Sequence, residues 1–199
     1  MLPIAATADE VHRRFRWFVP TVYNIAVDAC HKWAAADPER PAILQARRDG
    51  SVETWSFGRL SKAANRVSNV LVAIGVGRGD RVAILLPQSP ETAFSHIGIY
   101  AAGAVALPLA EVFGVDALTH RLTDSGARAV ITHRAGAAKI AEIRDLLPAL
   151  EAVFCIDGPT DGAIDFSAAT ARASDAFEPV ATLAEIAALV IYTSGTTGA

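Results

Sequence analysis

A run of hydroxyl side chains and glycines ends the sequence, and these residue types suit phosphate chemistry. The run is Thr193-Ser194-Gly195-Thr196-Thr197-Gly198, and it follows three apolar residues and Tyr192. Gly195 and Gly198 can adopt positive φ, which lets several backbone N–H groups turn inward and form a concave site for anionic oxygens. The hydroxyl groups add further donors. The pattern predicts a loop that binds a polyphosphate where it leaves a strand.

The same run can also be interpreted as a simple turn or linker, because clusters of Ser, Thr and Gly often form turns. It is not a Walker A loop, whose G-x-x-x-x-G-K-[ST] pattern requires a lysine that is absent here. The apolar residues in front of the run favour the phosphate loop, since residues 186–192 are predicted to form a buried strand.

The rest of the chain is expected to position that loop through alternating strands and helices. Apolar periodicity predicts helices at 24–36, at 57–74, from Pro90, at 115–124 and at 136–147. Further strands are predicted at 81–86, 104–109, 128–132 and 151–156, and a surface excursion with one helical turn near 166–173 is expected within 157–180. Such alternation implies an α/β fold with a mostly parallel sheet, helices on both of its faces, and ligands at the carboxyl ends of the strands.

Two local patterns refine this expectation near the start of the chain. Residues 41–47 and 52–55 flank an Asp-Gly pair, which predicts a small β-hairpin. Ser56 is placed to cap the helix that follows, and Gly75 is placed to end it.

Composition excludes several classes of protein. The chain has 199 residues, of which 52% are hydrophobic, and a net charge of −3, which argues against a general nucleic-acid binder. Cys30 and Cys155 lie far apart and fit a reducing compartment. The uncharged run from Thr92 to Ala110 contains His96, Gly103 and Pro108, so a buried helix and strand explain it better than a membrane span. Charges at 9–14 also argue against a secretory signal, so we expect a cytoplasmic protein.

Other chemistry is not supported by the residues. The glycines at 75–79 follow a helix and precede a strand, which is the wrong order for a dinucleotide-binding turn. The five histidines show no metal-binding spacing, and there is no G-x-S-x-G nucleophile motif. Cys155 lies within a predicted strand and is interpreted as a core residue, and the stretch 124–126 as a helix end. The basic and aromatic stretch 13–18 could contact nucleic acid, but we favour an N-terminal arm, residues 1–22, that lies on the domain.

Several stretches together resemble the adenylate-forming superfamily, which includes acyl-CoA synthetases and the adenylation domains of peptide synthetases. The string 191–198, IYTSGTTG, resembles the phosphate-binding motif of that group, which continues with a variable residue and Pro-Lys-Gly. Residues 79–91, 101–109 and 121–126 resemble further blocks of acyl-CoA synthetases, in the same order. Overall, residues 23–198 are similar to the N-terminal portion of such enzymes, and among them to short- and medium-chain acyl-CoA synthetases.

The resemblance implies an activity and its cofactors. Enzymes of this group convert a carboxylate and Mg-ATP to an acyl-adenylate and pyrophosphate, and a thiol, usually that of CoA, then captures the acyl group. By motif match, residues 193–198 hold the β- and γ-phosphates of ATP. The resemblance implies ATP, Mg²⁺ and CoA as cofactors, and a small carboxylate as substrate. The loop lysine, the acyl pocket and the catalytic lysine of the family have no counterpart among these residues.

We therefore expect 23–199 to be a partial AMP-binding domain, truncated at the phosphate loop and inactive alone. Three alternatives stay open: a fragment of a peptide-synthetase adenylation domain, a non-enzymatic nucleotide-binding module, and a remnant without function.

Overall fold

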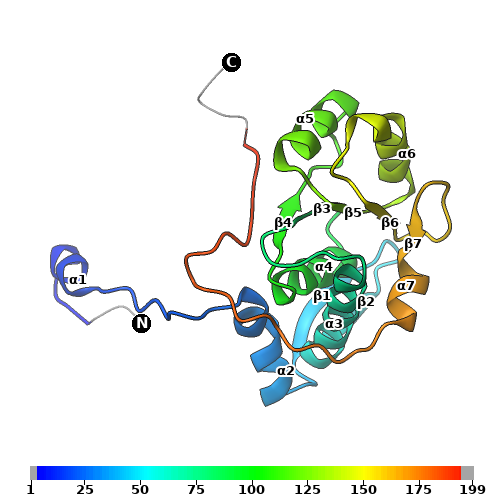
Figure 1. Cartoon of the computed structure of the whole chain (residues 1–199). Coiled ribbons are helices and arrows are strands. Elements are labelled where there is room, and N and C mark those ends of the chain that lie inside the picture. The colour runs from blue at the N-terminus through cyan, green and yellow to red at the C-terminus, as the bar shows by residue number, and fades with distance from the viewer. Residues whose placement is uncertain (1–3, 194–199) are drawn as a thin grey trace.

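The computed structural model describes residues 4–193 and is organised around a five-stranded parallel sheet (Figure 1). The strand order is β4-β3-β5-β6-β7, and every neighbouring pair is parallel. The strands are β3 (Arg81–Leu85), β4 (Val105–Pro108), β5 (Ala129–Thr132), β6 (Ala152–Cys155) and β7 (Ile164–Asp165). The predicted α/β fold is confirmed. The short strand β7 was not predicted, and it lies inside the stretch that was expected to be a surface excursion.

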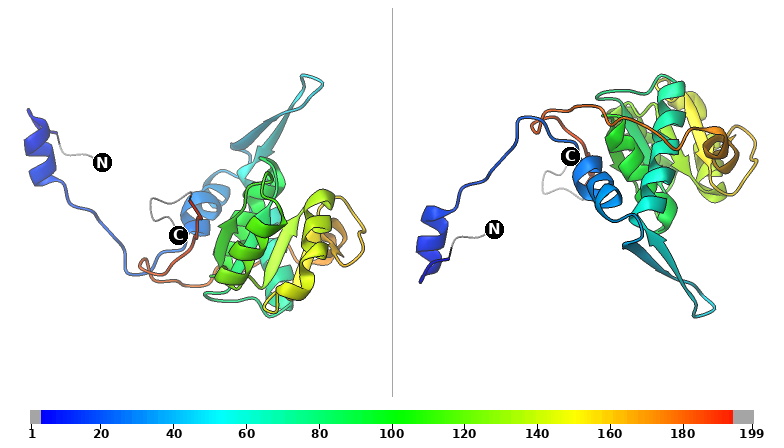
Figure 2. Two further views of the ribbon diagram at one scale, coloured as in Figure 1. Left: turned by 90° about the horizontal axis from the view of Figure 1, so that it is seen from above. Right: turned by 90° about the horizontal axis from the view of Figure 1, so that it is seen from below.

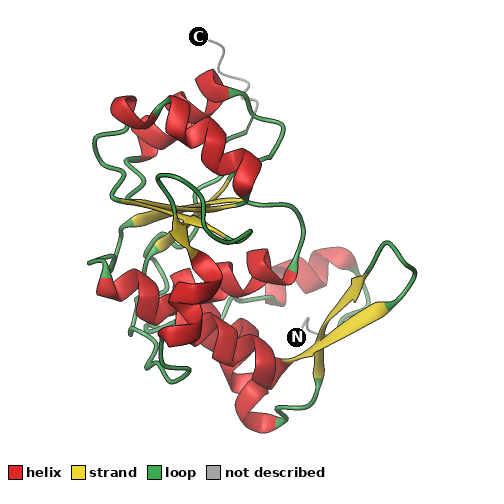
Figure 3. Ribbon diagram, turned by 90° about the vertical axis from the view of Figure 1, so that its right-hand side faces the viewer, coloured by secondary structure: helices red, strands yellow, loops and turns green. Residues whose placement is uncertain are grey.

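Helices cover both faces of this sheet (Figure 3). On one face, Val82 and Ile84 of β3 pack in the same cluster as residues of α3 (Phe57–Ala73) and α4 (Pro90–Ala101). On the other face, Ala83 and Leu85 cluster with residues of α5 (Val115–Ser125) and α6 (Arg134–Glu142). The two apolar faces explain why the strand sequences are continuously hydrophobic.

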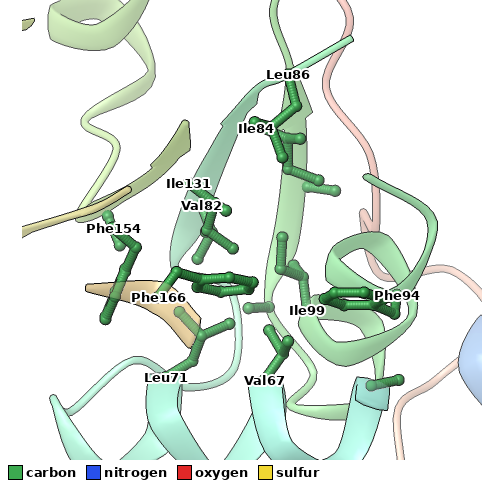
Figure 4. Packing of buried hydrophobic residues seen from close by; sticks show 14 of the residues in the cluster. Val67, Leu71, Val82, Ile84, Leu86, Phe94, Ile99, Ile131, Phe154 and Phe166 are labelled. Carbon is green, nitrogen blue, oxygen red and sulfur yellow. The ribbon is translucent and has the colours of Figure 1, made fainter. Parts of the chain in front are cut away.

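Aromatic rings fill the core between the sheet and α3 and α4 (Figure 4). Phe166, the first residue of α7 (Phe166–Arg172), stacks on Phe94 with ring centroids 6.1 Å apart. It also meets Phe154 of β6 edge to face at 6.2 Å. Each such pair contributes about 0.5–1.5 kcal/mol beyond the area that it buries. Phe166 therefore anchors the 157–180 stretch to the core.

Helices α3 and α4 approach each other so closely that one position between them requires glycine. A Cβ at Gly98 would lie 2.7 Å from the carbonyl oxygen of Ala64 and 2.8 Å from Cβ of Val67. The hydroxyl group of Ser68 donates to the carbonyls of Gly98 at 2.9 Å and Ala64 at 3.1 Å. This contact sets the position of α4, which carries side chains of the candidate site.

The predicted hairpin and helix caps are confirmed. Strands β1 (Pro41–Ala46) and β2 (Val52–Ser56) pair antiparallel and project from the domain (Figure 2). Ser56 caps α3, since its Oγ accepts from the amide of Arg59 at 3.3 Å. Gly75 and Gly126 follow α3 and α5 with positive φ values of 83° and 58°. Cys155, at 0% exposure, is a core residue as predicted.

Two predicted helices differ in detail from the observed ones. Between 25 and 36 the helix contains a π-helical segment, Val27–His31, followed by α2 (Lys32–Ala36). The helix predicted at 136–147 begins earlier, as α6, and ends at Glu142, and a 3₁₀ turn follows at Arg144–Leu146. His133 explains the early start of α6, because its Nδ1 accepts from the amide of Gly136 at 3.1 Å and caps the helix.

The N-terminal residues differ from the expectation of an arm that lies on the domain. A short helix, α1 (Ala8–Arg14), forms after Thr7, whose Oγ1 accepts from the amide of Glu10 at 3.2 Å. The helix projects away from the sheet (Figures 1 and 2), and Trp17 and Phe18 are 82% and 91% exposed. The expectation is therefore wrong. Because α1 is mostly charged and contains no buried residue, it presents no apolar face that could hold it on the domain.

The predicted buried strand at 186–192 is also wrong. This segment runs along the edge of β4 but makes a single bridge there, between Ala106 and Leu189, and its residues alternate between exposed and half-buried. Ala106 donates to Ala188 and accepts from Val190 at 2.9 Å each. The next rung would need an N–H at Pro108, which proline lacks. The preceding amide, of Ala104, already donates to Ile99 in the turn after α4.

Candidate functional site

The parallel sheet brings two loops together at the carboxyl ends of β3 and β4. From β3 the chain passes to α4 on one face of the sheet, and from β4 it passes to α5 on the opposite face. A crevice opens where neighbouring strands lead to opposite faces, and open α/β sheets bind their ligands at such points. In this structure a cleft of about 450 Å³ lies there, within the ordinary size range of small-molecule sites.

The wall of the cleft is mostly apolar. Leu86, Leu109 and Phe113 come from the two loops, and Ile191 and Tyr192 come from the segment that precedes the predicted phosphate loop. Three further polar side chains, Gln88, Thr92 and His96, line the cleft from the start and the first two turns of α4. The cleft thus joins an apolar wall to a few polar groups, which is the usual composition of a ligand site.

His96 is held in place by Tyr100, one helical turn further along α4. Nδ1 of His96 lies 3.1 Å from the phenol oxygen of Tyr100, so the two share a hydrogen bond. Burial lowers the pKa of His96 below its ordinary value of 6.5 and raises that of Tyr100. Both side chains are therefore neutral near pH 7. Nε2 of His96 makes no hydrogen bond to any residue that the structure describes, and it is not among the buried polar atoms that lack a partner.

The loop after β4 is fixed by contacts from α6. Lys139 donates to the carbonyls of Glu111 and Phe113 at 2.9 Å each. The side chain of Glu111 accepts a hydrogen bond from Nε2 of His133, with 2.8 Å between the atoms. Because Nδ1 of His133 caps α6 as an acceptor, its Nε2 carries the proton. These contacts give this side of the cleft a defined shape.

Tyr192 anchors the approach to the predicted phosphate loop. Its phenol group hydrogen-bonds to Asp124 near the end of α5, and its ring packs edge to face against His120. The guanidinium group of Arg121 lies 5.6 Å from the centre of the same ring. Burial, and next the hydrogen bond to Asp124, raise the pKa of Tyr192 to about 12. Thr193 follows directly, with its side chain exposed, at the edge of the cleft.

Of the residues predicted to bind phosphate, the structure describes Thr193 alone. Ser194, Gly195, Thr196, Thr197 and Gly198 lie outside the described residues, so their roles stay predictions. Among residues 4–193, there is no group of three His, Cys, Asp or Glu side chains that could hold a metal ion. Within the same residues, none of the helices combines the length and hydropathy needed to cross a bilayer.

Sequence reasoning missed the pairs His96–Tyr100 and Tyr192–Asp124. The first pair had a detectable signal, because polar residues recur at every fourth position, 88, 92, 96 and 100, in an otherwise apolar stretch. The second pair joins residues that lie 68 positions apart, and no local pattern indicates it. Asp124 was assigned only to the end of a helix, which is correct, since α5 ends at Ser125.

Comparison with known proteins agrees with this architecture. Residues 30–199 match the family described as AMP-binding enzyme. The mitochondrial acyl-coenzyme A synthetase ACSM2 of Rattus norvegicus is 30% identical over 190 residues, which are 90% of this chain and 33% of the relative. The chain thus spans about one third of the length of that relative.

Solved structures show the same likeness. An acyl-CoA synthetase from Brucella canis superposes with a TM-score of 0.84 at 30% identity, over 95% of this chain and 36% of that protein. The anthranilate CoA ligase AuaEII in complex with anthranoyl-AMP gives a TM-score of 0.79 at 30% identity, over 90% of this chain and 34% of the ligase.

Proposed function

Because the chain belongs to the family of AMP-binding enzymes, we propose that it is the N-terminal part of an ATP-dependent acid–thiol ligase. Such a ligase activates a carboxylate as an acyl-adenylate and transfers the acyl group to the thiol of CoA. The observation that carries the proposal is the position of Thr193, which begins the hydroxyl and glycine run at the edge of a cleft between β3 and β4. The printed names of its relatives, acyl-CoA synthetase and CoA ligase, support the same reaction class.

The proposed chemistry assigns a clear task to the loop. A carboxylate oxygen attacks the α-phosphorus of ATP, the bond to the bridging oxygen breaks, and pyrophosphate leaves. The loop 193–198 would hold the β- and γ-phosphates with backbone N–H and hydroxyl donors, so that attack occurs in line. Donors that are already in place stabilise the charge that develops on the leaving group. Mg²⁺ would neutralise part of the phosphate charge when it is bound.

The second step transfers the acyl group. The thiol attacks the carbonyl carbon of the adenylate, and AMP leaves as the carbon–oxygen bond breaks. The cleft lies beside the loop, so a group bound there is close to the α-phosphate and to the new mixed anhydride. In this proposal, residues 1–22 form an N-terminal arm, and 23–199 form part of an AMP-binding domain with a phosphate site at Thr193 to Gly198.

Exchange of labelled pyrophosphate into ATP tests the proposal, with a panel of fatty and aromatic acids as substrates. The measurement uses the protein from the whole reading frame that contains residues 1–199. We expect exchange that depends on the acid, and a decrease of about 10- to 150-fold for Thr193→Val or Ser194→Ala, the value of one hydrogen bond to a charged group. Ser167→Ala, on the exposed side of α7, is the control and should leave exchange unchanged. Absence of exchange with every acid would contradict the proposal.

A further inference from the structure

We propose that the cleft between β3 and β4 takes an uncharged, hydrogen-bonding part of a substrate, and that Nε2 of His96 recognises it. This inference rests on the proposed function, because it treats the cleft as a substrate site of the acid–thiol ligase. It goes beyond that function by stating which part of a substrate enters the cleft and which side chain selects it.

The charges around the cleft disfavour an anion. Of the described residues that line it, Glu111 is the only one with a carboxylate, and none is a lysine or an arginine. The nearby cations are engaged behind the wall. Lys139 donates to two carbonyls of the loop, and Arg121 donates to Ala117 and lies 4.1 Å from the ring centre of Phe113. A carboxylate or phosphate in the cleft would lose its hydration without gaining an opposite charge. The ionised groups of the substrates therefore stay at the phosphate loop.

The geometry of His96 provides recognition without charge. Tyr100 occupies Nδ1 at 3.1 Å, which fixes the orientation of the ring and leaves Nε2 as its second polar atom. Whichever nitrogen carries the proton, a neutral imidazole offers one donor or one acceptor at Nε2. An amide or hydroxyl group can meet either arrangement. Ser95, the neighbour of His96 in sequence, is fully buried, which fixes α4 against its surroundings.

The wall of the cleft favours a narrow chain with apolar parts on either side of such a polar group. Leu86 and Leu109 line it together with Phe113 and Tyr192. Two substrates of the proposed reaction carry this chemistry. One is the pantetheine arm of CoA, which has two neutral amides between short hydrocarbon links. The other is the tail of an acid that bears an amide or hydroxyl group.

Titration of the 199-residue chain, labelled with ¹⁵N, distinguishes these sources by the response of the His96 ring nitrogens. The probes are pantetheine, a medium-chain fatty acid, a hydroxylated acid of the same length, and inorganic phosphate. We expect pantetheine or the hydroxylated acid to shift Nε2 of His96, whichever of them is the source. The unsubstituted acid and phosphate should bind at least about threefold more weakly, the value of one net hydrogen bond.

Variants separate recognition from folding. His96→Leu should weaken binding of the responding probe by about three- to tenfold, and His96→Gln, which keeps a polar group, should restore part of it. His12→Leu on the exposed helix α1 is the matched control and should have no effect. No shift with any probe, an equal response to phosphate, or equal binding by His96→Leu would each overturn the inference. Pyrophosphate exchange does not enter this test, so a failure of the proposed function shows up separately.

Discussion

Replacing Gly98 with alanine should destabilise the domain, although alanine is the better helix former. Alanine in place of glycine in a helix contributes about 1 kcal/mol of stability. Against this, the new Cβ would lie 2.7 Å from the carbonyl of Ala64 and 2.8 Å from Cβ of Val67, so α3 and α4 must separate. Overpacking of this kind costs about 1–3 kcal/mol, and the hydrogen bond from Ser68 to Gly98 is worth about 1 kcal/mol more. We expect a net loss of about 1–3 kcal/mol.

Urea unfolding followed by circular dichroism measures this loss directly. For a domain of this size it corresponds to a decrease in Tm of about 2–12 °C. Gly77→Ala is the matched control, because a Cβ at Gly77 would meet no atom within 4 Å, and its effect should stay within about 0.5 kcal/mol. A Gly98→Ala variant at least as stable as the native chain would refute the reasoning, since it would mean that α4 can move away from α3 at no cost.

Three further changes test other parts of the structure. Ser56→Ala removes the hydrogen bond that caps α3 and should cost about 1 kcal/mol of unfolding free energy, whereas Ser56→Asp should restore it. Burial lowers the pKa of His31 and His96 below 6.5, so the free energy of unfolding should be full above that pH and fall as the pH drops through the folded-state values; urea titrations at several pH values should show this decrease, and replacing both by Gln should flatten it. Trp17→Ser with Phe18→Ser removes exposed aromatic surface, so self-association measured by analytical ultracentrifugation should decrease while the urea midpoint stays the same.

Most of the architecture follows from local signals in the sequence. The continuous apolar runs predict the strands β3, β4, β5 and β6, and the period of the apolar residues predicts the helices between them. Ser56, Gly75 and Gly126 mark helix boundaries through their backbone preferences. These features depend on residues that are close in sequence, so they can be recognised without knowing the fold.

The features that were predicted wrongly depend on contacts between distant residues. Residues 186–192 have the composition of a strand, but pairing needs free N–H groups on β4. Pro108 has none, and Ala104 uses its own in a turn. Likewise, Trp17 and Phe18 suggest an arm that packs on the domain, yet the charged helix α1 gives it nothing apolar to bury. The apolar wall of the cleft shows the same limit, because it combines residues from three separate segments of the chain.

Binding of MgATP to the 199-residue chain, mapped by the backbone amide signals, tests the central claim most directly. The account predicts that millimolar MgATP shifts the amides of 193–198 together with that of Tyr192, and that Thr193→Val weakens the response. The amides of β6 and β7, at the far side of the sheet, should stay unchanged. Shifts confined to another surface, or no shifts in the hydroxyl and glycine run, would contradict the claim that this run holds the phosphates of ATP.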